Sequence, residues 1–390
     1  MADSEHAPDL MAALAPLLPQ IAERAPEIEN VRRLPADLAQ KLANIGVFRM
    51  VTPAYLGGLE LSPREIVEVT EAVATADASV GWCTMIGATT ALNAAYMSPD
   101  AAHEVYNDPK IITGGVFAPM GKAWDEGDHF RVTGRWQWGS GSANCTWLCG
   151  GCMVYEDDKL LRLPSGAPEN RMMVFPASEA ELIDTWHTMG LQGTGSGDIA
   201  VTDIKVPKGR SVSLVADAPT TDSPLFKFPA FGLLSLGVAA AAMGNARGAL
   251  TAFKDLALGK KNQGSRKTLA ERAPIQIDYA KMDAALNAAR AYLFHEIDQT
   301  WDVAQNTDGE IPMERRADLR LACTHMVRTA ADVCRTAHDL AGGVDVYSNS
   351  EIQRRFRDAH AMTAHIVTAP ATYELIGRIL LDQSTDGAMV

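Results

Sequence analysis

The sequence lacks a hydrophobic run long enough to cross a membrane, which takes roughly 18 consecutive apolar residues. Its longest apolar stretch, GLLSLGVAAAAMGNARGAL (residues 232–250), is interrupted by a serine, an asparagine, an arginine and four glycines. We expect a buried helix there. The N-terminal stretch MADSEHAPDL contains neither a basic nor an apolar segment. We therefore expect no secretory signal, no membrane partner and a cytoplasmic protein.

Positive charge and cysteine are also scarce. Lysine and arginine total 35 against 48 aspartates and glutamates, for a net charge of −13. Nucleic acid and anionic membranes repel such a protein, so neither is an expected partner. Of the six cysteines, Cys145, Cys149 and Cys152 lie close together. Their segment has the pattern of a buried strand, with the thiols divided between two faces and no fourth ligand nearby. We therefore expect reduced thiols and no metal site.

Secondary-structure signals divide the chain into three segments. Residues 1–106 carry apolar residues at helical spacing, with helix-start signals at Pro35 and at Ser62. Residues 107–213 contain short β-branched and aromatic runs between glycine and proline turns. Residues 214–390 return to long alanine-rich helical patterns. We predict an α+β chain made of an N-terminal helical domain, a central β domain and a C-terminal helical bundle, with these boundaries.

The last helical region contains several residue types with chemical potential. It begins with Gly342-Gly343, where backbone can approach a ligand or a neighbouring subunit closely. The run QRRFRD at 353–358 follows, and we expect its helix to continue through His360 and His365. Five residues span about 140° of a helix, so at most one of these histidines is expected at a reaction centre.

This pattern of a glycine pair, a short loop, QRRFRD and a distal histidine resembles the acyl-CoA dehydrogenase superfamily. The stretch from Gly46 to Trp82 also resembles a signature of that superfamily. The resemblance implies an N-terminal helical domain, a central β-barrel or sandwich and a C-terminal four-helix bundle. Within the superfamily, the chain looks most like the two-component flavin-dependent monooxygenases, such as the oxygenases of hydroxyphenylacetate hydroxylase and dibenzothiophene monooxygenase.

The carboxylate that removes an α-proton in acyl-CoA dehydrogenases is missing. By motif its place falls on Ile366, and the other place known for it, within residues 231–236, has no carboxylate either. The late histidine that faces the flavin in the monooxygenases falls on His365. With an ordinary pKa of about 6.5 it would act as a base toward a phenol-like hydroxyl or stabilise a flavin C4a-(hydro)peroxide. The alternative is a structural histidine.

The resemblance places three glycine-rich stretches of the β domain beside the flavin: TGGVFAPMG at 113–121, WQWGSGS at 136–142 and GLQGTGSGD at 190–198. In the second stretch, the Ser140 hydroxyl would meet the reactive N5 edge as a hydrogen-bond donor, with Gly139 and Gly141 giving clearance. Each stretch could instead be a plain turn, and no dinucleotide-binding βαβ pattern surrounds the third. The flavin contacts so implied are Phe117, Ala118, Trp138, Gly139, Ser140, Gly141, Thr194 and Ser196.

The resemblance implies further contacts in the C-terminal segment. Asn262 and Ser265 occupy the slots of the superfamily's phosphate-binding Arg-x-x-Phe motif. Arg266 is then the nearest candidate for the flavin phosphate, unless it is an exposed loop charge. Gly342 and Gly343 would reach the flavin of a neighbouring subunit in a dimer of dimers, so we expect a homotetramer.

Three functions are compatible with the sequence. The first is a monooxygenase that receives reduced FMN or FAD from a separate NAD(P)H flavin reductase and inserts one oxygen atom into an aromatic or heteroatom-containing small molecule. No nicotinamide-binding fingerprint is visible in the chain, as this function expects. The second is an FAD-dependent acyl-CoA dehydrogenase or oxidase with a non-standard base. The third is a non-catalytic scaffold that binds no flavin.

Overall fold

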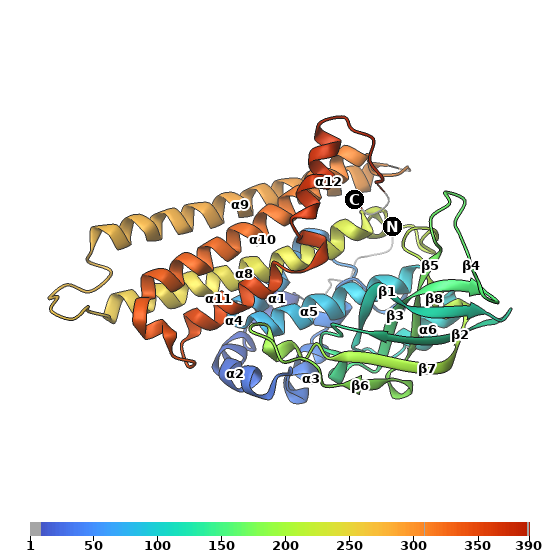
Figure 1. Cartoon of the computed structure of the whole chain (residues 1–390), viewed down its shortest axis with the longest axis horizontal. Helices are drawn as coiled ribbons and strands as arrows, with labels where there is room; N and C mark the ends of the chain where they lie inside the picture. Colours follow the sequence, from blue (N-terminus) through green and yellow to red (C-terminus); the bar gives the residue numbers. More distant parts are fainter. Residues whose placement is uncertain (1–8, 308, 388–389) are drawn as a thin grey trace.

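The computed structural model describes residues 9–307, 309–387 and 390. Long helices and a β-sheet occupy opposite ends of an elongated molecule, and the N-terminal helices pack along both parts (Figure 1). Helix α5 (Ala78–Thr90) contacts both the sheet, through β1 (Thr113–Asp125), and the helical part, through α8 (Ala230–Gly259). The chain therefore has the expected layout of N-terminal helices, central sheet and C-terminal helices, and α5 lies where the two ends meet.

The N-terminal helices begin where the sequence signals predict. Pro35 precedes one helix, and the Ser62 side chain accepts the N–H of Glu65 while the Glu65 carboxylate accepts the Ser62 N–H. This capping box satisfies backbone donors that the first helical turn leaves unpaired. The helices are α1 (Leu10–Leu14), α2 (Leu18–Val31), α3 (Ala36–Asn44), α4 (Pro63–Ala76), α5 (Ala78–Thr90) and α6 (Pro99–Tyr106).

The central strands form one sheet with the pairing order β6-β7-β2-β1-β3-β5-β8, and β4 pairs with β3. The β1–β3 pair is parallel, and the others are antiparallel. The sheet curls, because β5 and β7 approach each other although three strands separate them. The strands are β1 (Thr113–Asp125), β2 (His129–Trp136), β3 (Trp147–Glu156), β4 (Lys159–Leu160), β5 (Asn170–Pro176), β6 (Glu181–Ile183), β7 (Asp198–Pro207) and β8 (Ser211–Val212).

The indole of Trp136 fills the inside of this curled sheet and is fully buried. Its N–H donates to the carbonyl of Gly151 over 2.7 Å. Glycines at 121, 134 and 150 make room for the ring, since a Cβ at any of them would lie within 2.4–2.5 Å of it. Gly121, Gly134 and Gly150 therefore serve the packing of the core rather than the binding of a ligand.

The C-terminal helices run side by side as a bundle formed mainly by α8, α9, α10 and α11 (Figure 1). Of the described residues, α8 alone passes a length and composition test for a membrane span, but 89% of its apolar window is buried inside the protein. The residues 232–250 are thus the core helix that the sequence predicts. The helices are α7 (Pro224–Lys227), α8 (Ala230–Gly259), α9 (Ala273–Asn306), α10 (Met313–Ala341), α11 (Glu351–Met362) and α12 (Ala371–Leu380).

Short 3-10 turns join these elements. They are η1 (Val47–Arg49), η2 (Ala54–Leu56), η3 (Ala91–Ala95), η4 (Ser142–Asn144), η5 (Ala177–Glu179), η6 (Gln192–Thr194), η7 (Lys208–Arg210), η8 (Gly342–Val346) and η9 (Ile366–Thr368).

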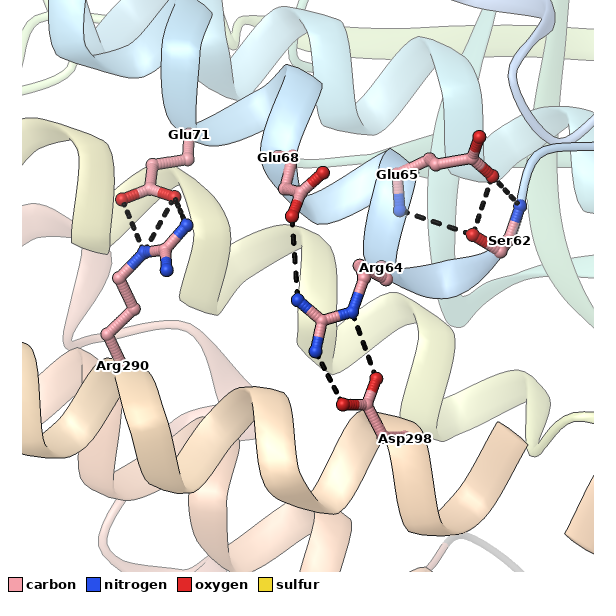
Figure 2. A network of polar contacts seen from close by, with 7 residues as sticks. All are labelled: Ser62, Arg64, Glu65, Glu68, Glu71, Arg290 and Asp298. Carbon is pink, nitrogen blue, oxygen red and sulfur yellow. Dashed lines mark hydrogen bonds and ion pairs between the residues drawn. The ribbon is translucent and has the colours of Figure 1, made fainter. Parts of the chain in front are cut away.

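Ion pairs tie the N-terminal helix α4 to the bundle helix α9 (Figure 2). Arg64 pairs with Asp298, and Arg290 binds Glu71 over 3.0 Å. The two guanidinium groups also lie over the ring of Phe294, at 4.5 and 4.3 Å from its centre. The two cation–π contacts add to ion pairs that are themselves partly exposed to solvent. They hold the N-terminal helices in register with the bundle.

Candidate active site

The predicted Ser140 turn is bound along its length to the glycine-rich loop at 190–198. The Gly139 N–H donates to the Gly197 carbonyl over 2.9 Å, and the Gly141 N–H donates to the Thr194 carbonyl over 2.9 Å. A Cβ on Gly139 would lie 2.7 Å from the Ile199 side chain, so glycine is required for this approach. The structure therefore brings together two of the three stretches that the sequence places beside the flavin.

Hydroxyl groups line this junction. The Ser140 Oγ lies 2.6 Å from the Ser196 Oγ, which lies 2.6 Å from the Thr194 Oγ1. All three side chains are buried. Such a connected and shielded set of hydroxyls is unusual in a simple turn, because buried polar groups are costly unless each has a partner.

Trp82 links this hydroxyl cluster to His365. The indole N–H donates to the Ser140 Oγ over 3.1 Å, and the ring meets the His365 ring edge-on with centres 5.5 Å apart. Trp82 lies on α5, whose start is capped by the Asp77 side chain accepting the Val80 N–H. Trp82 was not among the predicted site residues, although it closes the Gly46–Trp82 signature. Its place at the end of that signature was the sequence signal that could have identified it as a site residue.

His365 does not lie on the helix that the sequence predicts. Helix α11 ends at Met362, and His365 precedes η9. Two α10 arginines bind the carbonyls of this segment. Arg328 donates to Thr363 and Thr368, and Arg320 donates to Val367. Because these carbonyls have side-chain donors, the chain can leave the helix without losing backbone hydrogen bonds.

The pKa of His365 also differs from the ordinary value expected from the sequence. Burial, with the Arg320 charge nearby, lowers the pKa of the imidazole to about 4. The ring is therefore neutral at neutral pH and is a weak base. Its Nδ1 accepts the Val367 N–H over a long 3.4 Å, which leaves the proton on Nε2. The His365 ring is thus equipped to donate a hydrogen bond rather than to remove a proton.

The other histidine of this segment, His360, lies on α11 and packs edge-on against Phe356. The two histidines face different neighbours, as expected. The sequence predicts this from their separation of about 140° around one helix. In the structure the reason is that helix α11 ends between them.

Strand β1 carries a bulge at the predicted flavin contacts Phe117 and Ala118. Val116 pairs with Gly150 and the next pair joins Gly121 to Cys152, so residues 117–120 oppose Gly151 alone. Bulges of this kind take backbone groups out of the ladder and re-aim side chains. The Phe117 ring meets Phe231, at the start of α8, edge-on at 5.4 Å. The bulge therefore lies where the sheet contacts the bundle.

Trp138, another predicted contact, has a strained backbone. Its φ of 71° is left-handed, and its side chain is 59% exposed. A bulky residue rarely adopts this conformation, and such outliers concentrate at functional sites. The exposed indole next to the buried Ser140 is the surface against which a flat ligand could pack.

Helix α11 supports the loop at 190–198 from behind. A Cβ on Gly190 would lie 2.2 Å from the Arg357 carbonyl, and the Leu191 N–H donates to the Asp358 carboxylate over 2.6 Å. Burial raises the pKa of the Asp358 carboxyl to about 7, with a further contribution from the Asp77 carboxylate. Asp358 is only 4% exposed. It is therefore a support for the loop and is not placed to act as the missing dehydrogenase base.

The raised pKa of Asp358 predicts a pH-dependent stability. A carboxyl whose pKa is higher in the folded than in the unfolded chain stabilises the fold at low pH and loses that contribution as pH rises through the folded value. Between about pH 5.5 and about pH 8, wild type should lose about 2 kcal/mol of unfolding free energy relative to Asp358→Asn, which keeps the Leu191 acceptor without titrating. Urea unfolding of both proteins at the two pH values measures this. Parallel pH profiles would contradict the raised pKa.

The remaining predicted contacts, Arg266, Gly342 and Gly343, lie at the other end of the bundle. The loop that carries Arg266 and the loop after α10 are both at the end remote from the sheet (Figure 1). Lys260, which follows α8, donates to the Ala341 carbonyl beside the glycine pair. Because α8 contains 30 residues, its ends are about 45 Å apart. Among the described residues, no hydrogen bond joins Arg266, Gly342 or Gly343 to the Ser140 turn, and the glycine pair lies against Lys260 instead.

Hydrogen bonds and ring contacts hold the loop that begins with Gly342. Gly342 has a φ of 63° and ends α10. The buried Asp345 carboxylate accepts the Gln353 N–H over 3.0 Å and contacts the His338 ring at 2.6 Å. Val346 and Tyr347 project outward, 79% and 69% exposed. Arg266 is exposed, as the alternative interpretation of a loop charge expects.

No metal site is present among the residues that the structure describes, since no three His, Cys, Asp or Glu side chains gather as ligands would. The cysteines are free, and burial raises the pKa of the Cys83 and Cys149 thiols to about 12. Such thiols are protonated and unreactive at neutral pH.

Comparison with known families gives two matches that cover most of the chain. The family described as acyl-CoA dehydrogenase, N-terminal domain, matches residues 17–104, and the acyl-CoA dehydrogenase, C-terminal domain, matches residues 236–370. The two matches flank the sheet. They contain Trp82 and His365, respectively, but not the Ser140 turn.

Relatives over the whole chain are monooxygenases. An indole-3-acetate monooxygenase from Pseudomonas putida is 33% identical over 94% of this chain and 92% of its own. The oxygenase subunit HsaA of a flavin-dependent monooxygenase from Mycobacterium tuberculosis is 30% identical over 93% of both chains. A crystal structure of HsaA from that organism superposes with a TM-score of 0.88, covering 99% of this chain and 100% of HsaA at 28% identity.

These relatives decide between the functions that the sequence left open. Neither dehydrogenation nor a non-catalytic role agrees with them, and the place of the dehydrogenase carboxylate is taken by Ile366, which is 78% exposed. The chain belongs to the acyl-CoA dehydrogenase superfamily, within its flavin-dependent monooxygenases, and is an oxygenase component that uses reduced flavin.

Proposed function

We propose that this oxygenase acts on an aromatic small molecule, bound next to Trp82 and His365, with the reduced flavin at the Ser140 turn. The observation that carries the proposal is the Trp82 ring, which bonds the Ser140 hydroxyl through its N–H and contacts His365 at 5.5 Å. Relatives are named for indole-3-acetate and for resorcinol, which are both aromatic.

The residues present fit a flavin. A serine hydroxyl has two lone pairs and one proton. In Ser140 the Trp82 N–H takes one lone pair, and the Ser196 hydroxyl is the other described partner, so one lone pair stays open toward a ligand. The exposed Trp138 indole, two residues before Ser140, supplies a flat apolar surface, and the bulge at 117–120 leaves backbone groups of β1 outside the ladder. A planar ring with polar edges needs these features.

Reduced flavin, when bound, supplies the electrons with which dioxygen is activated, so that one oxygen atom enters the substrate and the other leaves as water. The protein's contribution is placement. Ser140 holds a polar edge of the ring, and Trp82 keeps the Ser140 hydroxyl in position. His365, neutral and protonated on Nε2, donates a hydrogen bond to an oxygen of the substrate. The buried hydroxyls and the Trp82 ring exclude water from one side of the site.

We further propose that a second copy of the chain completes the flavin site, in a homotetramer. The loops that follow α8 and α10, which carry Arg266 and the glycine pair, lie at the end of the bundle remote from the sheet and its Ser140 turn (Figure 1). The exposed Val346 and Tyr347 beside the glycines form the apolar surface that such a contact needs. Arg266 would then bind a flavin phosphate of the neighbouring copy.

The electrons would come from a separate reductase that uses NAD(P)H, because the chain itself carries no nicotinamide-binding fingerprint. The cytoplasm is our proposed location, in keeping with six free cysteines.

The proposal is tested by loading the purified protein anaerobically with reduced FMN or reduced FAD and mixing it with isotopically labelled dioxygen and an aromatic substrate. Indole-3-acetate and resorcinol are the first compounds to use. One labelled oxygen atom in the product, with little hydrogen peroxide, is the expected result. Unlabelled substrate together with bleaching of bound oxidised FAD by an acyl-CoA would overturn the proposal.

A further inference from the structure

Three buried hydroxyls join Trp82 to the backbone of the loop at 190–198. The Trp82 Nε1 lies 3.1 Å from the Ser140 Oγ, and two contacts of 2.6 Å continue through Ser196 to Thr194. The Thr194 Oγ1 then donates to the Leu191 carbonyl over 2.8 Å. Ser140, Ser196 and Thr194 are 6%, 2% and 1% exposed, so water does not compete for these bonds.

The two ends of this chain determine the direction of every hydrogen bond in it. An indole nitrogen only donates, and a carbonyl oxygen only accepts. Thr194 must therefore give its proton to Leu191, Ser196 must give its proton to Thr194, and Ser140 must give its proton to Ser196. The three hydroxyl protons then form the three hydrogen bonds Ser140–Ser196, Ser196–Thr194 and Thr194–Leu191. Any other placement of these protons breaks at least one of the three bonds.

The carbonyl at the accepting end is held in place. The Leu191 oxygen also accepts the Trp186 Nε1 over 2.8 Å and the Thr194 N–H over 3.1 Å. On the other side of the residue, the Leu191 N–H donates to Asp358 over 2.6 Å. The residue has a left-handed φ of 52°. The peptide cannot turn away without losing several bonds, so the direction of the chain is a property of the fold.

The direction of the chain leaves Ser140 without a proton to offer a ligand. It has only its second lone pair, so toward a flavin it acts as a hydrogen-bond acceptor and not as the donor that the sequence predicts. The N5 of a reduced flavin carries a hydrogen and needs an acceptor, whereas the N5 of an oxidised flavin has a lone pair and needs a donor. A lone pair facing a lone pair costs the desolvation of both without a bond.

We propose that Ser196 and Thr194 are positioning residues that select the reduced flavin. They hold the Ser140 proton away from the ligand, and this makes the site favour reduced over oxidised flavin. The inference rests on the proposed placement of the flavin N5 at Ser140. It adds to that placement the residues that determine which redox state is bound.

The experiment compares variants that release the Ser140 proton with one that does not. Ser196→Ala removes its acceptor. Thr194→Val removes the acceptor of Ser196, which then donates to Ser140 and frees the Ser140 proton for the ligand. Thr194→Ser is the control, because it keeps the hydroxyl and with it the direction of the chain. Anaerobic titration with reduced and oxidised flavin gives both dissociation constants, and the midpoint potential of the bound flavin gives their ratio independently.

Wild type and Thr194→Ser should bind reduced flavin more tightly than oxidised flavin. In Ser196→Ala and Thr194→Val the preference should fall about tenfold, which lowers the midpoint potential by about 30 mV for a two-electron couple. Unchanged ratios in both variants, or a wild type that binds both redox states equally, would overturn the inference alone. If wild type binds neither flavin, the proposed function fails as well. Should Ser196→Ala not fold, Thr194→Val decides.

Discussion

Replacing Ser140 with alanine should reduce the product formed per reduced flavin consumed about tenfold or more, with hydrogen peroxide accounting for the difference. Ser140 is the hydroxyl on which Trp82 and Ser196 converge, and it offers the open lone pair of the site. Its loss leaves the buried Trp82 N–H without a partner, which should also lower the unfolding free energy by about 1–3 kcal/mol. Product and peroxide are measured in the same single-turnover reaction, and stability by urea unfolding.

Ser142 provides the matched control. It lies in the same turn and is 5% exposed, and its hydroxyl is outside the Trp82-to-Leu191 chain. Ser142→Ala should keep the ratio of product to peroxide close to that of wild type. If Ser140→Ala keeps that ratio too, the hydroxyl has no part in the reaction and the turn is merely structural.

Replacing Arg355 with methionine should destabilise the fold by about 3–4 kcal/mol. The side chain is 4% exposed and donates to the carbonyls of Thr75 and Ala76, where α4 ends. It also pairs with Glu351 over 2.7 Å and lies against α8, where a Cβ on Gly248 would be 2.2 Å from the guanidinium. Methionine fills similar volume but leaves these carbonyls without donors and removes a cation from a helix C-terminus.

Arg335 on α10 is the comparison residue. Its side chain is 51% exposed and pairs with Asp332 and Asp339 on its own helix. Arg335→Met should change the unfolding free energy by no more than about 0.5 kcal/mol. Urea unfolding of both variants measures the difference. Similar midpoints for the two would mean that Arg355 does not join the three helices as its contacts indicate.

Local sequence signals predicted much of the fold, because they act over a few residues. Ser62 and Glu65 form a capping box through their spacing alone, and apolar residues 232–250 form a core helix through composition. The Ser140 turn was identified through the resemblance to the superfamily, and the structure shows that Gly139 is required there for close backbone approach. The charge balance and the missing carboxylate at Ile366 are also properties of the sequence itself.

The same local signals were wrong about His365. The sequence around it continues a helical pattern, but arginines from α10, distant along the chain, bind the carbonyls that follow Met362 and allow the helix to end. The pKa of about 4 for His365 comes from burial, which no pattern of neighbours states. Both features depend on packing between elements.

What the sequence by itself determined is therefore the order of helices and strands, the family, and the residue types at the flavin-facing turns. The tertiary structure decided which of these residues meet. It joined Trp82 to Ser140 across 58 positions of sequence and placed the loops that follow α8 and α10 at the end of the bundle remote from the sheet. It also gave the hydroxyl chain its direction. The physical reason is that hydrogen-bond direction and burial depend on groups that folding brings together. The distance between two such residues along the sequence does not predict whether they will meet.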